Sequence, residues 1–402
     1  MNMANYWFNS KLGYAPPDWF STFGNIDPGS PVKPPEFRRL MPLSRPDADY
    51  DLGSNAETWS YFWHPVATLA EFQSHSHTGR GPMATRLLDR QIVLVELDGK
   101  VQAFDDRCPH RSASLGLGVL DKGEFRCRYH GWRFDAAGRC TDIPSMEEGQ
   151  KVPGNIRLTQ FDCDVRYDLI WVRLKSGATT EIPHFPAWDD PTMTSHMGAP
   201  YLWPVSSGRR VANFTDVTHL PFGHKGTLGG PPYTRFKAYP IAQHDGMLEF
   251  QQDQFIAYNP GDATFGPPTG PESIMLPPGG YQVVMPFTVM LFFDFGQGRF
   301  SQIMMHPTPI DAENCRSYWI TSHTTDSSAT QEHLSLQSTV LTEDIAFVSS
   351  QNPRALSDEA GEMSVKADKP EIIWRRWLKR LIAAAAIGPA EIDRCLAETG
   401  TH

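Results

Sequence analysis

Two short segments of the chain each carry one cysteine and one histidine. The first reads Arg-Cys-Pro-His-Arg and places Cys108 two residues before His110. The second reads Cys-Arg-Tyr-His-Gly-Trp and places Cys127 three residues before His130. Thiolate sulfur and imidazole nitrogen are the usual protein ligands of zinc and of several iron centres. The spacing therefore predicts a metal centre that two loops build together.

The mixed composition of each loop favours iron over zinc. Structural zinc sites usually pair cysteine with cysteine and histidine with histidine along the chain, whereas each loop here supplies one of each. A Rieske [2Fe–2S] cluster needs this mixture, because two cysteines hold one iron and two histidines hold the other. Pro109, Gly131 and Trp132 fit the same pattern. We predict a Rieske cluster and electron transfer, with a structural Cys2His2 zinc site as the alternative.

A third segment offers ligands for a second metal. It reads Asn213-Phe-Thr-Asp216-Val-Thr-His219-Leu-Pro-Phe-Gly-His224. Two histidines five residues apart can converge on one ion if a helix ends between them, and a carboxylate from elsewhere would complete a face of two histidines and one carboxylate. That face leaves open positions on iron(II) for dioxygen. Histidines at this spacing are often only hydrogen-bonded, but an iron that activates dioxygen needs an electron supply, which the first site would provide.

Length and composition describe an ordinary globular protein. The 402 residues leave room for two domains and an extra arm, with 40% hydrophobic and 20% charged residues. A net charge of −10 argues against a nucleic-acid partner. Six cysteines are too few for a disulfide scaffold. No signal-peptide pattern opens the sequence, and no apolar run approaches the roughly 20 residues of a membrane span, so we expect a cytoplasmic protein without a membrane partner.

The expected elements divide the chain into an N-terminal arm (1–57), a small all-β domain (58–175) and a C-terminal α+β domain (176–402). The arm is rich in aromatic residues and proline. In the second region, strands at 92–96 and 101–104 flank the turn Asp98-Gly99, residues 134–140 hold another turn, and 169–174 form a last strand. We expect both ligand loops at hairpin tips of this domain.

The third region mixes strands with helices. Strands are expected over 281–295 and 300–306, and helices over 331–351 and 371–386, with Pro370 at the start of the second helix and Gly388 beyond its end. The fold class predicted for this region is therefore an antiparallel sheet flanked by helices.

The metal motifs together resemble the oxygenase α subunit of the Rieske non-haem iron oxygenases. The resemblance runs from Trp63 to Leu381, and within the family the chain is most similar to the caffeine and methylxanthine N-demethylases. Vanillate O-demethylase is a more distant relative with the same metal motifs. The matching stretches are Phe62-Trp-His-Pro-Val, Arg107-Cys-Pro-His-Arg-Ser-Ala, Arg209-Arg210 before Asn213-Phe-Thr-Asp, Gly226-Thr-Leu, Met285-Pro-Phe, Glu343-Asp344 and Val365-x-Ala-Asp-Lys.

The resemblance implies roles at the second metal site. His219 and His224 match the iron histidines, and Asp344 matches the carboxylate ligand, with the neighbouring Glu343 as the alternative. Asn213 is implied to line the iron pocket, and a role at a helix start is the alternative.

The resemblance also implies a link between subunits. Asp216 matches an acid that hydrogen-bonds His219 of its own chain and the cluster ligand His130 of an adjacent subunit, which implies a homotrimer. The alternative role for Asp216 is that of a helix-capping acid.

The implied reaction uses dioxygen and electrons from NAD(P)H. The chain lacks a plant-type ferredoxin cysteine run and a nucleotide-binding glycine fingerprint, so a separate reductase or ferredoxin must deliver the electrons. Residues 107–139 carry seven Lys or Arg against three Asp or Glu. Such a basic region suits docking of an acidic electron carrier. Solvated loop charges are the competing explanation.

The expected substrate is a small aromatic or N-methylated heterocyclic compound that loses its methyl group as formaldehyde. O-demethylation, hydroxylation and ring cis-dihydroxylation on the same scaffold are alternatives. An electron carrier with a Rieske domain and a non-catalytic second domain is a further one. Apolar candidates for the substrate cavity are Phe214, Leu228, Val284, Phe287, Val289, Leu291 and Phe347.

Overall fold

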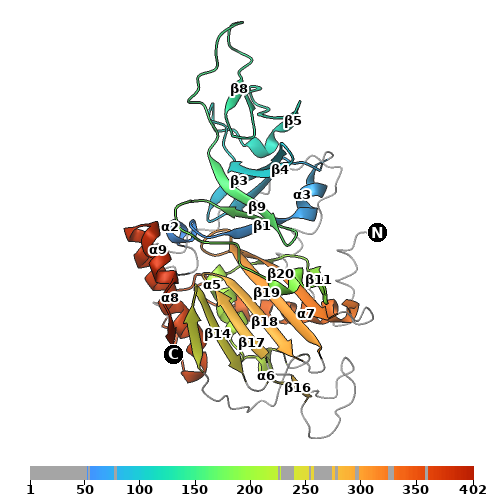
Figure 1. The fold of residues 1–402 in the computed structure, drawn as a ribbon, viewed down its shortest axis with the longest axis vertical. Helices are drawn as coiled ribbons and strands as arrows, with labels where there is room; N and C mark the ends of the chain where they lie inside the picture. The colour runs from blue at the N-terminus through green and yellow to red at the C-terminus, as the bar shows by residue number, and fades with distance from the viewer. Residues whose placement is uncertain are drawn as a thin grey trace. The chain divides into compact units, whose positions relative to one another are not determined.

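Figure 1 shows the fold as a computed structural model. The expected arm over 1–57 lies outside the described residues, apart from Leu52 and residues 55–57, and so does the cavity candidate Leu228. The structure describes residues 52, 55–76, 79–224, 227, 240–252, 255–257, 274–276, 279–294, 298–324, 330–357 and 361–402.

The first part of the described chain builds two antiparallel sheets. The larger has the strand order β1-β10-β9-β4-β3-β2 and the smaller the order β5-β6-β7-β8. The elements are α2 (Ala56–Trp59), β1 (His64–Thr68), α3 (Leu69–His75), β2 (Met83–Leu87), β3 (Arg90–Leu97), β4 (Lys100–Asp105), the 3-10 helix η2 (Leu115–Leu117), β5 (Val119–Asp121), β6 (Glu124–Arg126), β7 (Arg133–Phe134), β8 (Cys140–Asp142), β9 (Gln160–Arg166) and β10 (Leu169–Arg173).

The predicted hairpin and last strand are present in this part. β3 and β4 are joined by Asp98-Gly99, whose φ angles of 51° and 73° are the positive values that a tight type I′ turn requires. The ligand loops differ from the prediction in one respect. The loop with Cys127 is the tip of the β6–β7 hairpin, but the loop with Cys108 connects β4 of the larger sheet to η2 and is not a hairpin tip.

The second part holds a nine-stranded antiparallel sheet flanked by helices, so the predicted α+β class is confirmed. Its strand order is β11-β20-β19-β18-β17-β14-β13-β21, with β12 also paired to β20. The elements are α4 (Pro186–Asp189), β11 (Met193–Met197), β12 (Tyr201–Trp203), α5 (Ser207–Thr215), α6 (Leu220–Gly223), β13 (Ile241–His244), β14 (Met247–Gln252), β15 (Phe255–Ala257), β16 (Ile274–Leu276), β17 (Gly279–Val284), β18 (Thr288–Asp294), β19 (Phe300–Pro309), β20 (Cys315–Thr324), α7 (Thr330–Ser349), the 3-10 helix η4 (Lys366–Asp368), α8 (Lys369–Ile387), α9 (Pro389–Leu396) and β21 (Gly400–Thr401).

One expected strand is two strands. The region 281–295 is a β17–β18 hairpin in which Val284 pairs with Thr288 across the turn at Met285-Pro286-Phe287. Proline has no amide hydrogen to give to a sheet ladder, so Pro286 ends the first strand. The strand expected over 300–306 continues to Pro309, and α7 and α8 match the expected helices to within two residues at each end.

The two faces of the large sheet contact different partners. On β18, Val289 and Leu291 belong to the same buried cluster as Val211 of α5 and the apolar residues of α8. The alternate residue Met290 instead packs with Trp171 of β10. Because side chains of a strand alternate between faces, helix α5 packs on the face that Val289 and Leu291 share, and Met290 lies on the other face.

A chain of buried hydrogen bonds joins β1 to the large sheet. Nε2 of His64 donates to the carbonyl oxygen of Trp59 at 3.0 Å, so its Nδ1 accepts from Nε2 of His306 at 3.1 Å. Nδ1 of His306 in turn accepts from the hydroxyl of Thr288 at 2.7 Å. Burial lowers the pKa of His64 to about 4 and also holds the pKa of His306 well below its ordinary value. Both rings are therefore neutral at pH 7.

None of the helices in the described ranges is long and apolar enough to cross a lipid bilayer.

Candidate metal centres

Backbone hydrogen bonds shape each cysteine–histidine loop around its cysteine. The amide of Ser112 donates to the carbonyl of Cys108 at 2.9 Å, and the amide of Gly131 donates to the carbonyl of Cys127 at 3.0 Å. Gly131 has a φ of 78°, a conformation that glycine adopts without steric cost. Both cysteines are buried.

The two histidines of these loops lie side by side. The ring centroids of His110 and His130 are 4.4 Å apart, and Trp132 stacks on His110 with an interplanar angle of 8°. Nδ1 of His110 is buried and has no hydrogen-bond partner among the described residues. Buried polar atoms are normally paired, so this nitrogen is suited to bind a metal. Burial raises the pKa of the Cys108 thiol to about 11, and metal ligation would hold it as the thiolate instead.

His219, His224 and Asp344 meet at one point. The one-turn helix α6 begins after His219 and ends before His224, so a helix does end between the two histidines. Their Nε2 atoms are 3.1 Å apart. Oδ1 of Asp344, from α7, lies 3.3 Å from Nε2 of His219 and 3.2 Å from Nε2 of His224.

These three atoms form a triangle of the size expected for neighbouring ligands of one metal ion. Ligands at roughly 2.1 Å from a shared ion, and adjacent to one another in its coordination shell, are about 3 Å apart. Within the described part of the chain, no other group of three potential ligand atoms from histidine, cysteine or carboxylate lies so close together. Two imidazoles and one carboxylate on one side of an ion suit iron(II) with open positions.

Glu343 lies behind His224 and not in the triangle. Its Oε2 accepts a hydrogen bond from Nδ1 of His224 at 2.8 Å and another from the hydroxyl of Thr227. A carboxylate on the outer nitrogen of a metal-binding histidine fixes the ring and its tautomer. The geometry therefore favours Asp344 over Glu343 as the candidate metal ligand.

Asp216 occupies the corresponding position behind His219. It is the residue that ends α5, and its Oδ2 lies 3.5 Å from Nδ1 of His219, within ion-pair distance but too far for a well-formed hydrogen bond. Its Oδ1 accepts from the amide and hydroxyl of Thr218, beyond the helix. Asp216 therefore does not cap the amides of a helix.

The electrostatics of the triangle favour a bound cation. Burial lowers the pKa of His219, but the attraction of the Asp216 and Asp344 carboxylates outweighs burial and raises this pKa to about 9. The pKa of His224 is raised in the same way by Asp344 and Glu343. Burial alone would raise the pKa of Asp344, yet its contacts with the two histidines and Arg210 hold this pKa well below the ordinary range. A divalent ion would replace the protons that these groups otherwise attract.

Asn213 lies inside α5, so the alternative of a role at a helix start is wrong. A cavity of about 470 Å³ adjoins the triangle, and its walls include Asn213, Asp216, His219, Asp344 and Phe347.

The expected cavity residues are mostly in other places. Of the six candidates that the structure describes, Phe347 alone lines this cavity. Phe287, Val289 and Leu291 are packed in the hydrophobic core, Phe214 is partly buried against it, and Val284 packs on the other face of the sheet.

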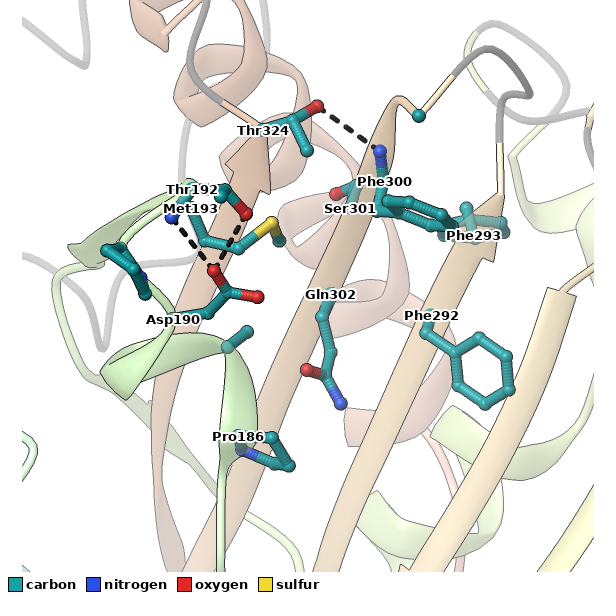
Figure 2. A pocket seen from close by; sticks show the side chains of 13 residues that line it. Pro186, Asp190, Thr192, Met193, Phe292, Phe293, Phe300, Ser301, Gln302 and Thr324 are labelled. Atoms are coloured by element: carbon teal, nitrogen blue, oxygen red, sulfur yellow. Dashed lines mark hydrogen bonds between the residues drawn. The ribbon is translucent and has the colours of Figure 1, made fainter.

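A larger cavity of about 770 Å³ lies on the opposite face of the large sheet (Figure 2). Phe292 and Gln302, which pair across β18 and β19, form part of its wall and point to the face on which Met290 packs. The carboxylate of Asp190 accepts hydrogen bonds from the amide and hydroxyl of Thr192 within it (Figure 2). Among the described residues that line it there is no histidine or cysteine, and we assign no chemistry to this cavity.

Comparison with known proteins identifies the family. The Rieske [2Fe–2S] domain matches residues 62–162, and the C-terminal domain of vanillate O-demethylase oxygenase matches residues 203–384. Methylxanthine N3-demethylase NdmB of Pseudomonas putida is 35% identical over 335 residues, which are 82% of this chain and 91% of the relative. The chain belongs to the Rieske non-haem iron oxygenases.

Other relatives agree with this assignment. Methylxanthine N1-demethylase NdmA of Pseudomonas putida is 32% identical over 336 residues, or 82% of this chain and 91% of the relative. The structure of NdmA with caffeine matches with a TM-score of 0.77 at 31% identity and covers 86% of this chain and 97% of that one. The predicted cofactors of this Rieske oxygenase are confirmed: a [2Fe–2S] cluster, a mononuclear iron, dioxygen and electrons from a reductase. The zinc site and the non-catalytic electron carrier are excluded.

Proposed function

We propose that this Rieske oxygenase removes a methyl group from a nitrogen atom of a small, flat heterocycle of the methylxanthine kind. The observation that carries the proposal is the similarity to NdmB and NdmA along 91% of their length, since both are named as methylxanthine N-demethylases. Matched structures of NdmA include one with caffeine and a mutant with theobromine. In the balanced reaction, the N-methyl substrate, dioxygen, NAD(P)H and a proton give the demethylated amine, formaldehyde, water and NAD(P)+.

We assign the cluster to Cys108, His110, Cys127 and His130, and the mononuclear iron to the triangle of His219, His224 and Asp344. When bound, the cluster supplies electrons singly, and the mononuclear iron provides a site for dioxygen activation. The chain supplies the ligand triangle, the carboxylates behind both histidines, and the burial of His224 and Asp344.

We further propose that Asp216 connects the two metal centres across a subunit boundary. The Asp216 side chain is 37% exposed, so another chain can reach it. An exposed apolar rim lies around the same cavity, with Phe222 65%, Phe347 60% and Met363 94% exposed.

The cluster loops expose apolar side chains as well, with Leu117 70% and Tyr129 64% exposed. Exposed apolar patches are characteristic of protein interfaces. The cluster loops of one chain are therefore proposed to cover the rim of the next, with His130 of the partner subunit hydrogen-bonded to Asp216, in a homotrimer.

We also propose limits for the two domains and a cellular location. A Rieske domain over 58–175 and a catalytic domain over 176–402 are supported by the two family matches, which fall within these limits. We propose the cytoplasm as the location.

O-demethylation is the second candidate. The match of residues 203–384 to the C-terminal domain of vanillate O-demethylase oxygenase favours it over hydroxylation. The carbon–oxygen bond of a methoxy group would then break in place of the carbon–nitrogen bond, again with release of formaldehyde.

Product analysis separates these reactions. The purified oxygenase is supplied with a generic reductase and a panel of N-methyl, O-methyl and unmethylated aromatic compounds. We expect formaldehyde from N-methyl compounds in a one-to-one ratio with the dioxygen and NAD(P)H consumed. A product that keeps its methyl group and contains both oxygen atoms of dioxygen would identify a ring dioxygenase and overturn the proposal.

A further inference from the structure

Arg210 is a fully buried arginine beside the metal ligands. Its Nη1 lies 3.3 Å from Oδ2 of Asp344 and also donates to Oδ1 of Asn213. Its guanidinium carbon lies 4.4 Å from the ring centroid of Trp203 and 5.4 Å from that of Phe214. Nε and Nη2 have no hydrogen-bond partner within the described ranges. Burying a partly unpaired guanidinium costs free energy, so stability alone does not explain this residue.

The two oxygens of the Asp344 carboxylate face different partners. Oδ1 points to the two histidines, and Oδ2 points to Arg210. Among the described residues, Arg210 is the one arginine or lysine that forms an ion pair with Asp344. The carboxylate is therefore held at both ends, with one oxygen in the metal triangle and the other turned away from it.

We propose that Arg210 is a positioning residue that makes Asp344 a one-oxygen ligand of the mononuclear iron. The inference rests on the ligand assignment proposed above. A carboxylate can bind a metal through one oxygen or through both. With Oδ2 held by the guanidinium, the triangle would offer a bound ion one atom from each of its three side chains. A second carboxylate oxygen would fill one of the positions that dioxygen needs.

Arginine suits this position better than lysine. Its guanidinium lies over the ring of Trp203 and presents its hydrogens in a fixed planar arrangement, whereas an ammonium group on a flexible stem does not fix its hydrogens in this way. Asn213 accepts a hydrogen bond from the same Nη1 that contacts Asp344. Asn213 thus acts on the iron site through Arg210.

The test is Arg210→Met in the full-length protein, with the Rieske cluster intact and the mononuclear site loaded with Fe(II). Two affinities are measured: Fe(II) by competition with a chelator, and nitric oxide, a probe for the dioxygen position, by electron paramagnetic resonance. We expect the Fe(II) affinity to be retained or increased, because Asp344 becomes free to bind through both oxygens. The nitric oxide affinity should fall roughly tenfold, which corresponds to about 1.4 kcal/mol.

Two further variants separate positioning from general disruption. Arg209→Met removes the neighbouring buried arginine of α5, which pairs with Glu362 and not with a metal ligand, so both affinities should stay at the wild-type values. Arg210→Lys keeps the positive charge and should recover part of the nitric oxide affinity.

Several outcomes would overturn the inference. If Arg210→Met binds Fe(II) and nitric oxide as the wild type does, Arg210 does not restrict Asp344 to one ligand oxygen. If the variant loses Fe(II) with its cluster spectrum unchanged, Arg210 retains the metal and does not limit its ligands.

A measurement on the wild type covers the case in which Arg210→Met does not fold. A crystal structure of the Fe(II)-loaded protein with only Oδ1 of Asp344 bound supports the inference, and one with both oxygens bound contradicts it. A wild-type protein that binds no Fe(II) at this site would refute the ligand assignment itself, before any variant is made.

Discussion

At the scale of single residues, adjacent carboxylates receive different roles from their place on α7. Successive residues of a helix project about 100° apart, so Glu343 and Asp344 cannot face the same point. Asp344 faces the two Nε2 atoms, and Glu343 faces Nδ1 of His224. The sequence alone leaves open which of the two is the candidate metal ligand. The answer depends on how α6 packs against α7, which local sequence patterns do not predict.

Glu343→Gln tests this division of roles. The amide keeps the size of the side chain but removes the charge that orients and polarises His224, so we expect the Fe(II) affinity to fall roughly 10- to 100-fold without disappearing. Iron content after dialysis against a chelator measures the change. Glu249→Gln is the matched control, because Glu249 pairs with His244 at the same 2.8 Å outside the site and its loss should leave iron content unchanged. Unchanged iron in Glu343→Gln would show that the pair does not support the ligand.

The roles of Arg210 and Thr227 were not predicted, because each role depends on a contact that forms only in the folded chain. Arg210 belongs to the quoted Arg209-Arg210 stretch, but its role depends on its contact with Asp344, which is far from it in sequence. The signal that was available is a pair of arginines about two helical turns before the aspartate of a metal motif. Thr227 belongs to the quoted Gly226-Thr-Leu stretch, but its contact with Glu343 depends on where α7 lies in the fold.

At the scale of elements, the sequence predicts a helix, strand or turn correctly where residues that are close together in the chain determine it. The helices α7 and α8, strand β10 and the turn at Asp98-Gly99 follow from apolar periodicity, propensity and turn chemistry, and all are present. The course of the chain around Cys108 and the break at Met285-Pro286 were not predicted correctly. The first depends on how the larger sheet joins the smaller one, and the second on a proline that was not weighed against a long apolar run.

The buried pair of His64 and His306 makes the junction between β1 and the large sheet sensitive to acid. The pKa of His64 is about 4 in the folded protein and about 6.5 in the unfolded chain, so the unfolded state binds more protons between these values. Stability from this group is fully present above pH 6.5 and is lost as the pH falls toward 4, by an amount on the order of 3 kcal/mol.

Urea unfolding at a series of pH values measures this loss. His64→Gln should be less stable at pH 7.5 but lose less stability than the wild type between pH 6.5 and 4. His244→Gln alters an exposed histidine and should keep the wild-type loss. Equal pH dependence in the wild type and His64→Gln would show that other groups determine acid sensitivity.

At the scale of the whole molecule, the charges around the cluster leave an exposed basic surface. The acids Asp121, Glu124 and Asp135 form ion pairs with Arg126, Arg133 and Arg139. The other four basic residues of this region are exposed, namely Arg107, Arg111, Lys122 and Arg128. Local pairing accounts for part of the basic excess, and the remainder lies on the surface that an acidic electron carrier would meet.

Lys122→Glu tests docking of such a carrier. Reversal of this charge should slow reduction of the cluster by an acidic ferredoxin or reductase several-fold at low ionic strength, with a smaller effect at high salt because salt screens surface charges. Stopped-flow absorbance of the cluster measures the rate. Lys100→Glu changes net charge equally at the β3–β4 turn and should leave the rate unchanged. Equal slowing by both variants would point to net charge and not to a docking surface.

The proposed trimer predicts that two variants, each inactive alone, regain activity when they assemble together. Cys108→Ser removes the cluster and leaves Asp216 intact, and Asp216→Asn keeps the cluster and its visible spectrum but breaks the link between metal centres. Each variant alone should be inactive. If electrons pass between subunits, a co-expressed mixture will contain boundaries at which an intact cluster from one chain meets an intact Asp216 from another. Activity should then return to a fraction of the wild-type value, and light scattering should report three chains per particle. If electrons stayed within one chain, every chain in the mixture would remain defective and the mixture would be as inactive as its parts.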